Sequence, residues 1–270
     1  MNNSQTATAN YESPPLDEVV LGVQFEAIPD FTSAEIGAVR SLFSGEFPLV
    51  QEQPPLTPQF EVFGRDPGGA VLPRISLERA PLRSRMWFLS NEGNHLVQFQ
   101  EDRFLLNWRR GTNGAEYPRF SGTSAVFLKN LSLLDEYVSQ TRGQKLKYNQ
   151  AEVSYINIID MENLAEAGDW LRFLSFENQD IETVAASFSE VIRDETKSAP
   201  FARLHVELST VLRRDTRKRS LRLGLTVRGR PTEIGQDGVG AFVKRARDRI
   251  VKRFGELTTQ KASIAWRKIE

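Results

Sequence analysis

Hydrophobic and polar side chains alternate most regularly between Leu96 and Arg109. Two runs rich in aromatic and branched residues, 96–100 and 103–109, flank the polar pair Glu101-Asp102, and this pattern predicts a β-hairpin. One face of the hairpin is apolar and the other polar: Val97, Phe99, Phe104, Leu106 and Trp108 against Gln98, Gln100, Arg103, Asn107 and Arg109. We expect the apolar face in the core. The polar face is either solvated, as in most antiparallel sheets, or the place where a ligand or partner binds.

Similar alternation, or a short apolar run, predicts further strands along the chain. These are residues 18–26, 60–63, 74–78, 86–89, 151–159, 203–212, 221–227 and 262–269. Asp66-Pro67-Gly68-Gly69 predicts a turn before the strand at 74–78, and residues 213–219 predict a hairpin loop.

Apolar residues at helical spacing predict four helices. They cover residues 32–43, 122–140, 181–192 and 239–257, and Asp237 is the expected N-cap of the last one. The helices at 122–140 and 239–257 each have one apolar stripe, so each must lie on a sheet. The resulting fold class is α+β, with a curved antiparallel sheet wrapping long helices.

The order hairpin, long helix, strand occurs twice, at 86–159 and at 201–270, which suggests two related units. We expect a disordered tail at 1–10, an N-terminal α+β unit at 11–160, an acidic connector at 161–200 and a basic C-terminal α+β unit at 201–270. With 270 residues, the chain is long enough for the two units to form one compact fold.

Composition excludes several kinds of site. The chain has no cysteine and only two histidines, His95 and His205, so disulfides and cysteine-ligated metal sites are excluded. We expect no cofactor and no metal. The N-terminus lacks the basic start and apolar run of a signal peptide, and no apolar stretch approaches membrane-spanning length. The expected location is the cytoplasm, away from membranes.

A net charge of zero hides a strong asymmetry along the chain. Residues 1–200 contain 17 Lys+Arg against 28 Asp+Glu, whereas residues 201–270 contain 18 against 7. The segment 160–198 is the most acidic part. Either the two parts attract each other or the basic part faces an acidic partner.

The basic residues concentrate in the predicted hairpin loop and on one side of the last helix. The candidate partner-binding residues are Arg213, Arg214, Arg217, Lys218, Arg219, Lys244, Arg245, Arg249, Lys252 and Arg253. An acidic protein or a nucleic-acid backbone would bind such a surface. The alternative is neutralisation by the chain's own acidic segment 160–198. A homodimer is also compatible with the sequence.

Candidate ligand-binding residues lie on the polar face of the strands at 203–212 and 221–227. They are Arg203, His205, Glu207, Arg222 and Arg228. Alternating arginine and glutamate can bind a phosphorylated small molecule, but the same residues can form cross-strand ion pairs. Trp108 and Trp266 are expected to be core anchors.

No catalytic motif is present. The glycine-rich stretch 235–240 lacks the lysine of a phosphate-binding loop, and neither G-x-S-x-G nor HExxH occurs. The sequence therefore predicts no catalytic residue and favours a protein that is not an enzyme.

Three stretches together carry a resemblance. They are Tyr11-x-x-Pro14-Pro15-Leu16-x-Glu18-Val19-Val20, Asn107-Trp108-Arg109 with Tyr117-Pro118, and Glu152-Val153-x-Tyr155-Ile156-Asn157. Their order and spacing resemble a sporadically distributed bacterial family of unassigned function, over most of the chain. Members of that family often have a histidine after the Tyr-x-Asn motif, where this chain has Ile158. Patchy distribution of the family implies a role such as defence or toxin neutralisation.

The sequence thus leaves three hypotheses open. The first is a non-catalytic protein that recognises a macromolecular partner through the basic C-terminal surface. The second is a nucleic-acid-binding protein that uses the same surface. The third is an enzyme or sensor that holds a phosphorylated ligand on the polar sheet face.

Overall fold

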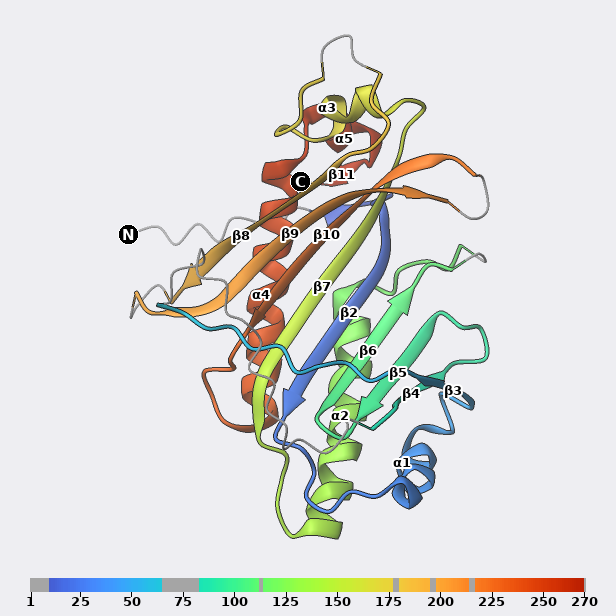
Figure 1. Ribbon diagram of the computed structural model, residues 1–270, viewed down its shortest axis with the longest axis vertical. Coiled ribbons are helices and arrows are strands. Elements are labelled where there is room, and N and C mark those ends of the chain that lie inside the picture. Colours follow the sequence, from blue (N-terminus) through green and yellow to red (C-terminus); the bar gives the residue numbers. More distant parts are fainter. Residues whose placement is uncertain are drawn as a thin grey trace.

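A nine-stranded antiparallel sheet forms the main part of the described chain (Figure 1). The computed structural model describes residues 10–64, 83–111, 114–176, 180–194, 198–213 and 217–269. The strands follow the spatial order β3-β4-β5-β6-β2-β7-β10-β9-β8. Two long helices, α2 and α4, cover one face of this twisted sheet (Figure 1). The predicted α+β class, with a curved antiparallel sheet and long helices, is confirmed.

The strands of the main sheet are β2 (Leu16–Phe25), β3 (Leu49–Gln53), β4 (Arg85–Leu89), β5 (His95–Gln100), β6 (Arg103–Arg109), β7 (Tyr148–Asp160), β8 (Ala185–Arg193), β9 (Pro200–Leu212) and β10 (Arg219–Gly229). The α-helices are α1 (Ile36–Phe43), α2 (Arg119–Arg142), α3 (Ala167–Trp170), α4 (Gly235–Leu257) and α5 (Gln260–Ala265). Two 3₁₀ turns, η1 (Ser33–Glu35) and η2 (Leu164–Glu166), precede α1 and α3, and β1 (Asn10–Tyr11) pairs with β11 (Lys268–Ile269) in a separate small sheet.

The predicted hairpin at 96–109 is confirmed as β5 and β6. Phe99 lies opposite Phe104, and Val97 lies opposite Leu106. All four side chains are fully buried on the face covered by the helices. The apolar face of this hairpin is therefore core, as its alternation predicts.

Each long helix contributes its apolar stripe to the core. In α2 the predicted stripe is buried at Phe127, Leu131, Leu134 and Val138. The α4 stripe packs mainly on β7 and β10, and it includes Phe242, Ala246, Ile250 and Phe254. Helices of this length require such tertiary packing, because isolated helices gain little stability in water. Within the described residues, no helix is both long and apolar enough to cross a membrane.

The two halves of the chain repeat one topology, but with different boundaries from those predicted. Strand β2 leads to the meander β4-β5-β6 and helix α2, and strand β7 leads to the meander β8-β9-β10 and helix α4. In space, β4-β5-β6-β2 and β8-β9-β10-β7 have the same order, with β2 and β7 paired antiparallel at the centre. The strand after α2 therefore begins the second half and does not end the first. The segment predicted as an acidic connector supplies the edge strand β8.

Two predicted elements in the second half of the chain have the wrong type. Residues 181–192 were expected to form a helix, but β8 pairs there with β9 as an edge strand. Residues 262–269 were expected to form a strand, but 262–265 belong to α5 and only 268–269 form a strand, β11. The first turn of α5 is capped by the Thr259 side chain, which accepts the Ala262 N–H. In both places a short apolar segment fits either spacing, and tertiary pairing decides the outcome.

Smaller corrections concern the N-cap of α4 and the strand at 60–63. Helix α4 begins at Gly235 with Ile234 as N-cap, so Asp237 lies in the first turn, where its charge favours the helix dipole. Residues 60–63 form no strand, although they belong to an extended segment described below. The predicted strand at 74–78, the turn at 66–69 and all but the last residue of the tail at 1–10 lie outside the described residues.

Candidate functional site

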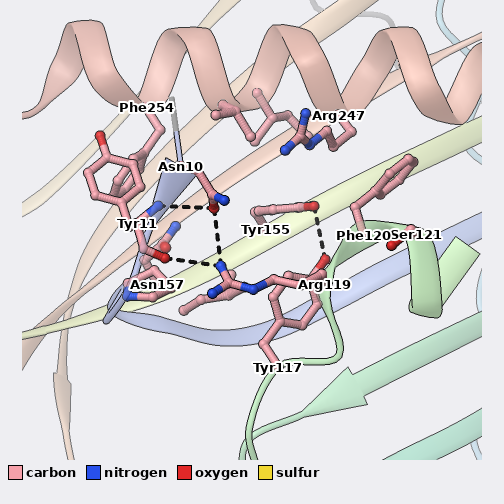
Figure 2. A pocket seen from close by; sticks show the side chains of 14 residues that line it. Asn10, Tyr11, Tyr117, Arg119, Phe120, Ser121, Tyr155, Asn157, Arg247 and Phe254 are labelled. Atoms are coloured by element: carbon pink, nitrogen blue, oxygen red, sulfur yellow. Dashed lines mark hydrogen bonds between the residues drawn. The ribbon is translucent and has the colours of Figure 1, made fainter. Parts of the chain in front are cut away.

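A cavity of about 400 Å³ lies on the helix side of the sheet, where α2 begins beside α4 (Figure 2). Side chains from five parts of the chain line it: the N-terminal segment, β2, β7, the start of α2 and the middle of α4. The lining residues are Asn10, Tyr11, Pro14, Leu16, Tyr117, Arg119, Phe120, Ser121, Tyr155, Asn157, Arg247, Ile250, Val251 and Phe254. This size and this mixture of apolar walls with a few polar groups are typical of a small-molecule site.

Two tyrosine hydroxyls meet on one wall of the cavity. The Tyr117 and Tyr155 oxygens are 3.1 Å apart and share a hydrogen bond (Figure 2). Burial raises the pKa of both phenols, and for Tyr155 the neighbouring Tyr117 raises it further while Arg247 lowers it. Both hydroxyls therefore stay protonated at neutral pH and offer neutral hydrogen-bonding groups to a ligand.

Arg247 of α4 brings a positive charge to the same wall. Its side chain points toward Tyr155 (Figure 2). One guanidinium nitrogen donates to Asp248 at 2.9 Å, but Nε is buried and has no hydrogen-bond partner. A buried donor without a partner costs free energy unless a ligand or water accepts from it. Arg247 therefore adds a positive charge to this wall, while its Nε itself is enclosed by protein atoms.

Arg119 is held at the rim by the N-terminal segment. Its guanidinium donates to the Tyr11 carbonyl at 3.0 Å and to the Asn10 side chain at 3.1 Å (Figure 2). The backbone of Arg119 has φ 64°, in the left-handed region that residues other than glycine rarely adopt. Such strain persists where the surroundings fix it, often at binding sites.

The N-terminus of α2 opens onto the cavity through Arg119, Phe120 and Ser121. Its N-cap is Pro118, which forms no side-chain cap. The free N–H groups of a long helix favour an anion at this end. Together with Arg119 and Arg247, this helix end brings positive charge to the cavity lining.

The three stretches that carry the family resemblance meet at this cavity. Tyr11, Pro14 and Leu16 come from the first, Tyr117 from the second, and Tyr155 with Asn157 from the third. Sequence reasoning treated these motifs as structural and did not identify the cavity. Their aromatic and amide composition was the available signal, but only folding brings residues 11, 117 and 155 together.

No family model and no curated protein matches this chain.

The predicted ligand residues on the polar sheet face lie in two groups. Arg203 and His205 of β9 contact the carboxylate of Glu61, with His205 Nε2 at 2.6 Å, and Arg228 of β10 lies 3.8 Å from it. Arg228 also donates to Glu152 at 2.8 Å. The first group therefore surrounds an anion from the chain itself.

The second group is Arg222 and Glu207, which form a cross-strand ion pair with 3.9 Å between nitrogen and oxygen. Neither residue contacts Glu61 in the described part of the chain. Glu207 is largely exposed. This pair is the ordinary ion pairing that the sequence left open as the alternative. Within the described residues, no group of three His, Asp or Glu side chains is placed to hold a metal ion.

The predicted basic loop contacts the acidic segment at two points. Arg213 forms an ion pair with Asp160 at 3.0 Å, and Arg219 donates to the Glu182 carbonyl at 3.3 Å. Arg217 and Lys218 are exposed. Arg214 lies outside the described residues. The Arg213–Asp160 pair agrees with neutralisation inside the chain, whereas the partner of Arg219 is a backbone carbonyl.

The cations on α4 divide in the same way. Arg249 and Arg253 both bind Glu190 of β8, at 2.8 and 2.7 Å, and Arg245 lies 3.6 Å from Asp194. Lys244 and Lys252 are exposed, and no carboxylate of the described residues lies within ion-pairing distance of either. Partner or nucleic-acid binding through this surface remains a prediction, with fewer free cations than the sequence suggested.

The ion pairs of Glu190 with Arg249 and Arg253 give a first testable prediction. Glu190→Gln leaves Arg249 and Arg253 without their shared carboxylate, so we expect the free energy of unfolding to fall by about 1–2 kcal/mol in urea denaturation. Glu256→Gln is the matched control, because Glu256 is more exposed and contacts only Arg253, at 3.1 Å. Equal losses in the two variants would contradict the view that Glu190 neutralises the helix.

Proposed function

We propose that the protein is a non-catalytic binding protein whose helix-side cavity holds a small amphipathic anion, with an acidic group beside an apolar or aromatic body. The observation that carries this proposal is the pairing of opposite chemistries in one cavity of about 400 Å³. Arg119, Arg247 and the N-terminus of α2 supply the positive groups of its lining, and Ile250, Val251 and Phe254 supply apolar surface from α4.

The polar and apolar parts of the cavity would bind different parts of the ligand. A carboxylate, phosphate or sulfonate would accept hydrogen bonds from the Arg247 guanidinium and from the helix N–H groups. The apolar body would pack on Val251 and Phe254, while the Tyr117 and Tyr155 hydroxyls orient it.

The test uses 1-anilinonaphthalene-8-sulfonate, which joins an aromatic body to one anionic group and fluoresces in apolar surroundings. We expect saturable binding to the folded protein at one site. Arg247→Gln should weaken that binding at least tenfold, because a charge-assisted hydrogen bond is lost. Val251→Phe should weaken it by filling the cavity while the rim charges remain.

Arg245→Gln is the matched control on the same helix, since Arg245 contacts Phe201 and Asp194 outside the cavity. It should bind the probe as the unchanged protein does. Near-ultraviolet circular dichroism checks that each variant is folded. Probe binding that neither Arg247→Gln nor Val251→Phe alters would reject the cavity as the site.

A further inference from the structure

The sheet face opposite the helices is covered by an extended segment of the chain, residues 54–63, which we name the strap. Figure 1 shows it running in cyan across the sheet from the β3 side toward β9. Its contacts follow this path: Leu56 bonds to Gln100 of β5, Gln59 to Gln24 of β2, and Glu61 to Arg203 of β9. On the polar face of the hairpin the strap therefore covers Gln100, whereas Gln98 and Asn107 bond to side chains of the sheet.

Glutamine side chains bind the strap backbone in the manner of neighbouring strands. Gln100 accepts the Leu56 N–H at 2.8 Å and donates to the Leu56 carbonyl at 3.0 Å. Gln24 accepts the Gln59 N–H at 2.9 Å and donates to the Gln59 carbonyl at 2.7 Å. Prolines at 54, 55 and 58 keep the strap extended and remove N–H donors that a strand would use. This face of the sheet therefore binds the backbone of a peptide segment that runs across the strands.

A cluster of charges fixes the acidic end of the strap. Arg203 and His205 bind the Glu61 carboxylate directly, and Arg228 lies 3.8 Å away. The Glu61 side chain retains only 5% of its exposure. Burial raises the pKa of Glu61, but the hydrogen bond and charge of His205 and the two arginine charges lower it more, so the pKa lies below its ordinary value. The cluster is thus a selective site for a carboxylate.

The strap lacks the apolar anchoring of a permanent structural element. None of its residues belongs to the hydrophobic core, and Phe60 and Val62 are about half exposed, at 51% and 48%. The sheet surface beneath it is mainly polar, with Gln24, Gln100 and Gln150, and Leu105 is an apolar exception that lines the cavity between strap and sheet. Removing the strap from this surface exposes little apolar area to water. Displacement of the strap therefore avoids the loss of hydrophobic burial, which is the main free-energy cost of opening a protein interior.

The fit between strap and sheet is also incomplete. A cavity of about 220 Å³ lies between them, lined by Leu56 and Gln59 of the strap and by Arg103, Gln150 and Arg228 of the sheet. Gln150 is 5% exposed, and its side-chain oxygen is buried without a hydrogen-bond partner. A different peptide with a donor at this point would satisfy a group that the strap leaves unpaired.

From these contacts we propose that the polar sheet face is a binding surface for an extended acidic peptide, and that the strap is its displaceable occupant. The partner is a protein segment that keeps an extended backbone and places a carboxylate five residues after an aliphatic side chain, as Leu56 and Glu61 do. This surface lies on the opposite side of the sheet from the helix-side cavity, so the proposal does not depend on the proposed ligand.

The experiment measures binding of a fluorescent peptide with the sequence of residues 54–63 by anisotropy. The full-length chain should bind it weakly, because its own strap competes at high effective concentration. Glu61→Gln loosens that strap and should raise peptide affinity at least tenfold. A peptide with glutamine in place of its glutamate should lose that gain, and so should the double variant Glu61→Gln/Arg203→Gln. Glu52→Gln is the matched control, since Glu52 is an exposed carboxylate in β3.

Hydrogen exchange on the unchanged protein keeps the proposal testable if Glu61→Gln fails to fold. The N–H groups of Leu56 and Gln59 should exchange at least a hundredfold faster than those of β10. Exchange of these N–H groups as slow as that of the β10 N–H groups would show that the strap is permanent. A Glu61→Gln variant that folds but does not bind the peptide would show the same, and either result would overturn the proposal. If the Glu61→Gln variant forms a dimer in which the two copies exchange straps, the occupant of the surface is a second copy of this chain. That result would overturn the proposal of a peptide from another protein.

Discussion

Replacing Trp108 with alanine is expected to lower the free energy of unfolding by about 3–5 kcal/mol. The indole is 1% exposed, lies between the neighbouring strands β2 and β5, and contacts the Tyr117 ring at a centroid distance of 4.9 Å. Truncation leaves a large cavity at the centre of the first half of the sheet, which the surrounding strands cannot close. Urea denaturation and thermal melting would measure the loss, with the melting temperature falling by roughly 10 °C.

Trp87→Ala is the control for this prediction. Trp87 is only partly buried, contacts the Arg85 and Arg109 guanidiniums, and donates to Gln98 at 3.0 Å. We expect a clearly smaller loss from its truncation, because solvent can reach the space it leaves. A Trp108→Ala protein that melts within a degree or two of the parent would contradict the placement of the hairpin's apolar face in the core.

The second large effect is expected at Trp266, near the end of the chain. Its ring stacks on Phe254 at 5.4 Å and on Trp170 at 5.7 Å, and Tyr11 meets it edge-on at 6.4 Å. This aromatic cluster joins the N-terminal segment, α3, α4 and α5. We expect Trp266→Ala to cost about 3–5 kcal/mol, because several ring contacts and a 93% buried side chain are lost together.

Ile264→Ala, in the helix α5 that Trp266 caps, is the matched control. Ile264 is 71% exposed, so its truncation should change the free energy of unfolding by less than about 0.5 kcal/mol. Tyr11 also lines the helix-side cavity, so Trp266→Ala should weaken binding of 1-anilinonaphthalene-8-sulfonate even in conditions where the protein is folded. Equal stability of the Trp266 and Ile264 variants would refute the role of the cluster in holding the chain's two ends.

The basic surface illustrates how tertiary structure changes a sequence-based interpretation. The sequence distinguishes a cationic helix face from ordinary mixed charge, but it cannot say which carboxylates lie opposite. Glu190 is about sixty residues before Arg249 and Arg253, and only the pairing of β8 with β9 brings it to α4. Charge pairs between distant segments depend on strand order, which local patterns do not encode.

Local patterns were sufficient where burial on one face decides the structure. The alternation at 96–109 determined the hairpin, its register parity and the buried position of Trp108, because a shift of one residue would expose the whole apolar set. The helical stripes of α2 and α4 determined both long helices for the same reason. The sequence alone therefore determined the α+β class and most of the core.

Only the tertiary structure decided the two surfaces for which we propose binding. The helix-side cavity needs Tyr11, Tyr117 and Tyr155 from separate parts of the chain. The sequence of the strap predicts only a proline-rich loop. In the structure, Gln24, Gln100 and Arg203 bind it across the sheet. Polar residues on a strand look alike whether water, an ion pair or a peptide covers them, because alternation reports only which side is apolar.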